Sequence, residues 1–150
     1  MKLGSFFLPL VLASTFLCLP VAAGEEDLLS TLVYEDIESV HISLIPWGPH
    51  LGFESEIEGG DPRLKALVAV IRAAEPGAGH KCPNRGAVRF RMVGGSVIAA
   101  GLLPSHDKGV YEIRLYQGDR LQGVYGVRRA ALLAAFEGLG VPIDDPAFTD

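Results

Sequence analysis

The chain has 150 residues, with 13 lysines and arginines, 18 aspartates and glutamates, and two cysteines. This length predicts one domain that can bury a hydrophobic core without disulfide or metal support. It excludes a large multidomain enzyme and a long repeat array. The near-balanced charge argues against a general nucleic-acid binder, which needs a surplus of basic side chains to neutralise phosphates.

Segment 1–23 has the pattern of a secretory signal peptide. Lys2 supplies a positive start, an apolar run follows over 6–19, and the small side chains of Val21 and Ala23 precede the expected cleavage point. The alternative is a transmembrane anchor, which needs about 20 uninterrupted apolar residues. We therefore expect cleavage after Ala23 and a periplasmic or secreted protein.

The mature chain is then a single domain over 24–150. No second long apolar run follows, so we expect no transmembrane segment after cleavage. Removal of the signal also removes Cys18 and leaves Cys82 as the one cysteine. An exported protein with a single thiol is unusual enough to make that residue a candidate site.

Two strands are predicted early in the mature chain, after a short helix or loose arm at 25–33. Segment 37–45 alternates between apolar and polar side chains, which is typical of a half-buried strand. Its expected inner face is Val40, Ile42 and Leu44, and its outer face is Ser39, His41 and Ser43. Segment 53–57 is expected to return as a second strand with glutamates on one face.

A helix is predicted over 62–75. Asp61 stands at the N-cap position, Pro62 suits the first helical position because its missing N–H costs nothing there, and apolar residues recur at helical spacing. Pro76 and the following glycine are expected to end the helix and to open a loop over 76–86.

The second half of the chain predicts four more strands and a last helix. The expected strands cover 87–93, 96–103, 110–116 and 121–127, and the helix covers 128–139. Short glycine-containing links between these strands favour antiparallel neighbours. The tail over 141–150 is expected to be extended.

Together these elements predict an α+β fold. We expect a twisted antiparallel β-sheet, with a four-strand meander plus the N-terminal strands, and two helices packed on one face. No internal repeat is apparent in the sequence.

Charge is segregated along the mature chain. Segment 24–61 holds ten acidic and no basic residues, 62–129 holds twelve basic and four acidic, and 130–150 holds four acidic. Such asymmetry often marks an interaction surface. The simpler interpretation is that the acidic and basic segments lie against each other within one molecule.

Five arginines form the candidate anion- or partner-binding face: Arg89, Arg91, Arg114, Arg128 and Arg129. Guanidinium groups bind carboxylates and phosphates with two donors. The alternative is a solvated polar face that pairs in part with the acidic segment. Aromatic side chains interleaved with the arginines would be expected for single-stranded nucleic acid, and only Tyr116 is near them, so nucleic acid is rejected as a partner.

The second candidate site is a thiol or metal site formed by His80, Cys82 and His106. Basic neighbours make a thiol more nucleophilic, and mixed nitrogen and sulfur ligands suit Cu or Zn. No paired cysteine or histidine spacing supports a metal, so no cofactor is the leading expectation. The simpler interpretation of Cys82 is an inert, partly buried thiol.

The leading hypothesis is therefore a small exported, non-catalytic binding or accessory module that recognises a protein or an anionic envelope component. One alternative is a thiol- or metal-dependent envelope protein centred on His80 and Cys82. Another is an enzyme inhibitor or structural envelope protein, because segment 46–52 carries a rigid loop with Trp47. No nucleophile–base constellation points to an enzyme.

Overall fold

The computed structural model describes residues 27–46, 48, 51–79, 81–103, 109–145 and 148. The predicted signal peptide lies outside the described residues, so its expected role stays a prediction. Within the described part of the chain, no helix is both long and apolar enough to cross a membrane.

The described elements are seven strands, three α-helices and one turn of 3-10 helix. The helices are α1 (Leu28–Thr31), η1 (Tyr34–Asp36), α2 (Leu64–Arg72) and α3 (Arg129–Gly138). The strands are β1 (Ile37–Leu44), β2 (Phe53–Glu58), β3 (Glu75–Pro76), β4 (Gly86–Met92), β5 (Val97–Leu102), β6 (Val110–Gln117) and β7 (Arg120–Arg128).

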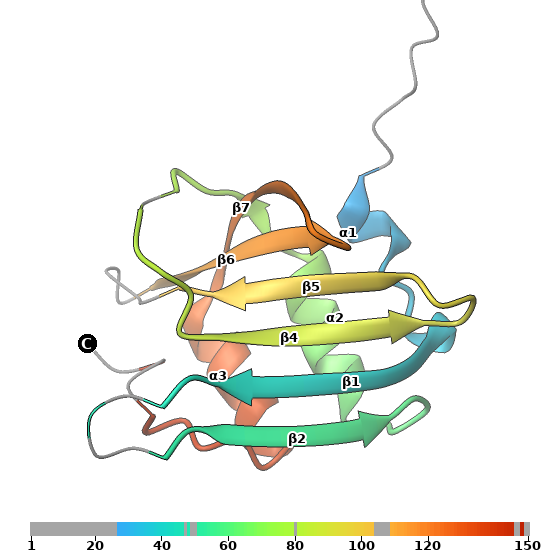
Figure 1. Cartoon of the computed structure of the whole chain (residues 1–150), viewed down its shortest axis with the longest axis horizontal. Helices are drawn as coiled ribbons and strands as arrows, with labels where there is room; N and C mark the ends of the chain where they lie inside the picture. Colours follow the sequence, from blue (N-terminus) through green and yellow to red (C-terminus); the bar gives the residue numbers. More distant parts are fainter. Residues whose placement is uncertain are drawn as a thin grey trace, which may run out of the picture.

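All seven strands belong to one antiparallel sheet. Its order is β2-β1-β4-β5-β6-β7-β3, so β4 to β7 are neighbours in chain order (Figure 1). The chain is mostly β, and the antiparallel sheet expected from the sequence is confirmed. An α+β fold is consistent with this sheet and its helices.

One face of the sheet is buried, and the strand periodicity explains which side chains it carries. In β1 every second residue from Val40 onward is buried, and in β4 Val88, Phe90 and Met92 alternate with exposed or half-buried residues. Because side chains on a strand alternate between faces, the buried set of each strand lies on the same side as that of its neighbour. Figure 1 shows α2 and α3 behind the sheet.

Helix α2 contributes an apolar stripe to the same core. Its buried residues are Leu64, Leu67, Val68 and Ile71, which recur at the three- and four-residue spacing of one helix face. The helix is preceded by a turn in which the Asp61 carboxylate accepts the Arg63 N–H at 2.9 Å. The predicted cap therefore acts on this turn, and the regular helix begins at Leu64.

The end of α2 differs from the prediction. The helix stops at Arg72, and residues 75–76 form the short strand β3, which pairs with β7 at Gly126 and Tyr125. The Gly77 N–H continues this contact by donating to the Val124 carbonyl at 2.9 Å. Two paired residues carry no periodic signal in the sequence, so the loop prediction over 76–86 missed this strand.

The expectation of an extended tail is wrong for its described residues. The Asp145 N–H donates to the Pro142 carbonyl, and the Phe148 N–H donates to the Asp145 carbonyl at 2.8 Å, so the chain turns. Phe148 is 1% exposed, and its ring lies 5.2 Å from Phe136 and 5.9 Å from Tyr111 between centroids. Burial of this aromatic side chain holds Phe148 against the core.

Candidate functional site

The face of the sheet opposite the core carries mostly polar side chains, and their charge changes from one strand to the next. Strand register places Glu56 opposite His41, His41 opposite Arg89, Arg89 opposite Ala99, and Ala99 opposite Tyr116. Directly opposite residues on neighbouring strands point to the same face. We call this surface the open face and define it by these residues together with Ser39, Ser43, Glu54, Glu58, Ala87, Arg91, Val97, Gly101 and Arg114.

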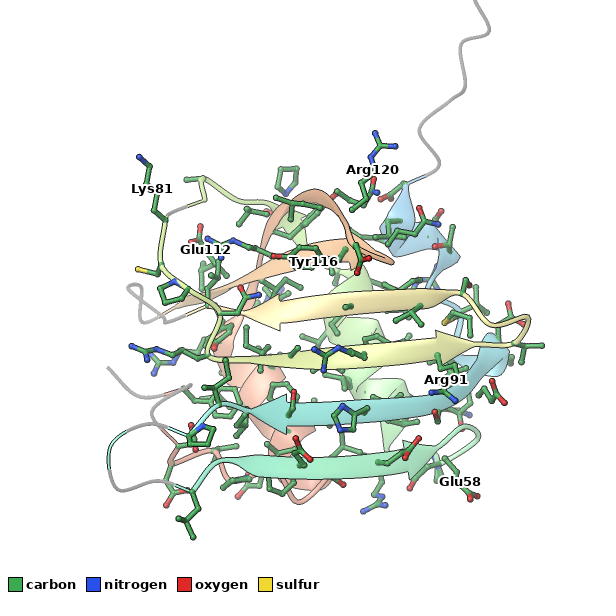
Figure 2. The ribbon with its side chains drawn as sticks, in the orientation of Figure 1. Glu58, Lys81, Arg91, Glu112, Tyr116 and Arg120 are labelled. Carbon is green, nitrogen blue, oxygen red and sulfur yellow. The ribbon has the colours of Figure 1, made fainter. Side chains whose placement is uncertain are left out.

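Arg89 and Arg91 are the exposed cations of this face. They stand two residues apart on β4, so their Cα atoms are about 7 Å apart along the strand. The Arg89 Nη1 lies 3.5 Å from the Ser43 hydroxyl on β1. Within the described part of the chain, no ion pair joins either guanidinium to a carboxylate. Figure 2 shows Arg91 on the viewer's side of the sheet, with Tyr116 on the same side.

Arg114 shares the open face but has a structural contact. Its Nη1 donates to the Asn84 Oδ1 at 3.1 Å, so it ties the loop before β4 to β6. The side chain of Asn84 in turn lies over Gly101, where an added Cβ would stand 2.5 Å from the Asn84 Nδ2. Gly101 therefore leaves room for the loop that carries Asn84, and Arg114 holds that loop in place.

The other two predicted arginines lie apart from Arg89 and Arg91. Arg128 stands opposite Val110 at the far end of β7, where it lines a pocket beside α2. Arg129 begins α3 and donates to the backbone carbonyl of Phe148, which packs in the core. The five arginines predicted as one group are thus divided among the open face, a pocket and the C-terminal segment.

The glutamates of β2, which belong to the acidic segment, lie in the same sheet as Arg89 and Arg91. Glu54, Glu56 and Glu58 are exposed on β2, and β1 separates them from β4 by two strand spacings, about 10 Å. The ion pair found among the described residues is Arg63–Asp61, at 2.6 Å on the surface. The open face is therefore negative at β2 and positive at β4, with serines and a histidine between them.

The thiol candidate is seen only in part. Cys82 is half-buried and forms no disulfide with any described residue. His80 and His106 lie outside the described residues, as do Trp47 and His50 of the inhibitor-type loop. Among the residues that can be placed, no group of three or more histidine, cysteine and acidic side chains is arranged to hold a metal.

One feature was missed by the sequence analysis: a pocket of about 1040 Å³ at the β7 end of the sheet. It is lined by the last turns of α2, by β3 and the three residues after it, by β6 and β7, and by the start of α3. Most of the lining residues are small or apolar, three are charged, and all of them come from three stretches of chain, 69–79, 110–112 and 126–131. No local motif could have indicated it.

Comparison with known proteins adds no family to this geometry. No family model matches the chain, no curated protein matches it, and no solved structure matches it.

Proposed function

We propose that this protein is a small exported binding module, without catalysis of its own, whose open face recognises an anionic segment of a partner protein. The observation that carries the proposal is the pair of exposed guanidinium groups on β4, Arg89 and Arg91, which have no described ion-pair partner. In this proposal, the β4–β7 meander and the helices on one face serve as a rigid support for the other face.

The spacing of the pair favours an extended acidic peptide. Side chains two residues apart on an extended strand repeat about every 7 Å, which is the separation of Arg89 and Arg91 along β4. Each guanidinium can bind one carboxylate with two parallel hydrogen bonds. The carboxylates of β2 would repel such a peptide on one side and so restrict where it lies.

Side chains beside the arginines supply contact area for a partner. Tyr116 lies two strands from Arg89 on the same face, and Leu121 opposite it is 49% exposed. Tyrosine and arginine are enriched among the residues that dominate protein–protein binding. Ala99 lies between Arg89 and Tyr116, and its small side chain leaves space on the face between these two larger side chains.

The experiment is fluorescence anisotropy with a labelled peptide in which glutamate alternates with serine or threonine. Exposed ion pairs contribute about 0.2–1 kcal/mol each, so we expect weak binding that falls as salt rises. The double substitution Arg89→Gln and Arg91→Gln should lower the affinity by about three- to tenfold.

The matched control is the double substitution Arg72→Gln and Arg120→Gln. These arginines are also exposed, and their replacement changes net charge by the same amount. If the control weakens peptide binding as much as the Arg89/Arg91 variant, attraction depends on total charge and the proposed face is wrong. Absence of binding by the unmodified protein at low salt would also reject the proposal.

A further inference from the structure

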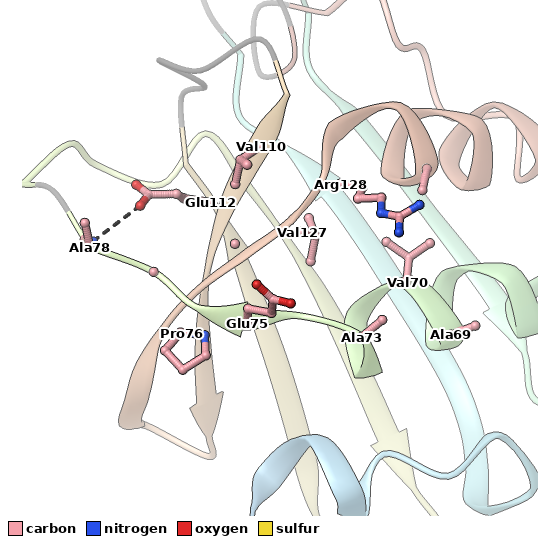
Figure 3. A pocket seen from close by; sticks show the side chains of 14 residues that line it. Ala69, Val70, Ala73, Glu75, Pro76, Ala78, Val110, Glu112, Val127 and Arg128 are labelled. Carbon is pink, nitrogen blue, oxygen red and sulfur yellow. Dashed lines mark hydrogen bonds between the residues drawn. The ribbon is translucent and has the colours of Figure 1, made fainter.

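The pocket at the β7 end of the sheet has the composition of a small-molecule site. Val70 of α2 and Ala73 just after it form one wall, and Val110 of β6 and Val127 of β7 face it (Figure 3). Its volume of about 1040 Å³ is at the upper end of the range for such sites. Binding of an apolar ligand there would be favourable because it removes apolar surface of both the ligand and the pocket from water.

The charged groups of the pocket are separated. Among the described residues that line the pocket, Arg128 is the one cation, and in Figure 3 its guanidinium lies beside Val70. Glu112 lies beside the loop after β3, where its Oε1 accepts the Gly79 N–H at 3.3 Å, and Glu75 lies on β3 between Ala73 and Pro76 (Figure 3). No described ion pair joins Arg128 to either glutamate.

The position of Arg128 indicates where the carboxylate of a ligand would lie. A carboxylate at Arg128 would gain a charge-assisted hydrogen bond next to an apolar wall. The same group near Glu75 and Glu112 would be repelled. Arg128 is exposed, so a ligand head group can reach it from solvent.

We propose that this pocket binds a monocarboxylate with an apolar body, of the fatty-acid class. Its carboxylate lies at Arg128, and its hydrocarbon chain lies against Val70, Ala73 and Val110. The proposal uses residues other than those of the open face, so it does not rest on the function proposed above.

The first test measures displacement of a fluorescent probe, dansyl-labelled undecanoic acid, from the full mature chain. Dodecanoate below its micelle concentration is the competitor. Ala69→Phe places a large ring in the pocket and should lower probe affinity about tenfold or more. Ala66→Phe is the control, because Ala66 is also exposed on α2 but does not line the pocket.

The second test examines the head group. Arg128→Gln should weaken dodecanoate binding about tenfold, because it removes the charge-assisted hydrogen bond to the carboxylate, and should leave dodecanol binding unchanged. Arg120→Gln, at the opposite end of β7, should change neither.

Several results would overturn the proposal. The probe could fail to bind, Ala66→Phe could weaken it as much as Ala69→Phe, or dodecylamine could displace it better than dodecanoate does. The last result would assign the pocket to a cationic amphiphile held by Glu75 and Glu112.

Discussion

Phe148 anchors the C-terminal segment with one side chain. It is 1% exposed and contacts the rings of Phe136 and Tyr111. Truncation of a buried phenylalanine to alanine removes apolar contact and leaves a cavity. We expect Phe148→Ala to lower the free energy of unfolding by about 3–5 kcal/mol, measured by urea denaturation. Leu121→Ala, at a half-exposed position, should lower it by less than about 1 kcal/mol.

Tyr111 makes stability depend on alkaline pH. Burial raises the pKa of its phenol far above the ordinary value of 10.0, the nearby positive charge of Arg129 opposes this, and Asp145 adds to it. Below about pH 10 the phenol is protonated in both the folded and the unfolded chain. Above that pH the unfolded chain loses the proton first, so the free energy of unfolding falls.

We therefore expect the Tyr111 contribution to fall by up to about 1.4 kcal/mol per pH unit above pH 10. Urea denaturation at a series of pH values measures this slope. Tyr111→Phe removes the ionisable group and should make the slope less steep. Equal slopes in the two proteins would show that Tyr111 does not titrate differently on unfolding.

At the scale of the elements, Gly59 permits the close approach of β2 and β1. A Cβ at this position would overlap the backbone carbonyl oxygen of Ile37, and the Gly59 N–H donates to the Glu38 carbonyl at 2.8 Å. We expect Gly59→Ala to destabilise the protein by about 1–3 kcal/mol, because backbone must move to admit the methyl group.

Gly138, unlike Gly59, has space for an added methyl group. It lies in the last turn of α3, and nothing lies within 4 Å of an added Cβ. Alanine forms helix better than glycine, so Gly138→Ala should stabilise the protein by up to about 1 kcal/mol. Thermal unfolding of both variants tests the pair. A stabilised Gly59→Ala would contradict the close contact between β2 and β1.

The elements that the sequence predicted well are those with a long periodic pattern. Strand β4 was expected at 87–93 and lies at Gly86–Met92, and β6 was expected at 110–116 and lies at Val110–Gln117. Alternation over seven or eight residues defines both the strand and its buried face. Strand β3 has only two residues, so its existence depends on pairing with β7, which no local pattern records.

The candidate site, too, was predicted only where it depends on a local pattern in the sequence. That Arg89 and Arg91 share a face follows from their spacing on one strand. That Arg128 and Arg129 belong elsewhere depends on the end of β7 and on the position of Phe148, which come from distant parts of the chain. The pocket combines α2, β3, β6, β7 and α3, so it exists only in the assembled fold.

At the scale of the whole molecule, the segregated charge of the sequence becomes a gradient across one sheet. The acidic strand β2 is at one edge, and the basic strand β4 is the third strand from that edge. The simpler interpretation was that the acidic segment lies against the basic one, but β1 separates β2 from β4, and no described ion pair joins these two strands. Unmatched charge on an exposed face steers charged partners and is screened by salt.

The last prediction concerns the exported form of the chain. In a bacterial host with a general secretion pathway, the protein should appear outside the cytoplasm with residues 1–23 removed. Native mass spectrometry of the exported fraction, purified without reductant or chelator, should give the mass of chain 24–150. Ala23→Leu should block removal, because the cleavage site needs a small side chain there. A full-length chain in the cytoplasm would contradict export. A mass increased by a bound metal or by a disulfide-linked molecule would favour a thiol- or metal-dependent function of Cys82 over binding at the open face.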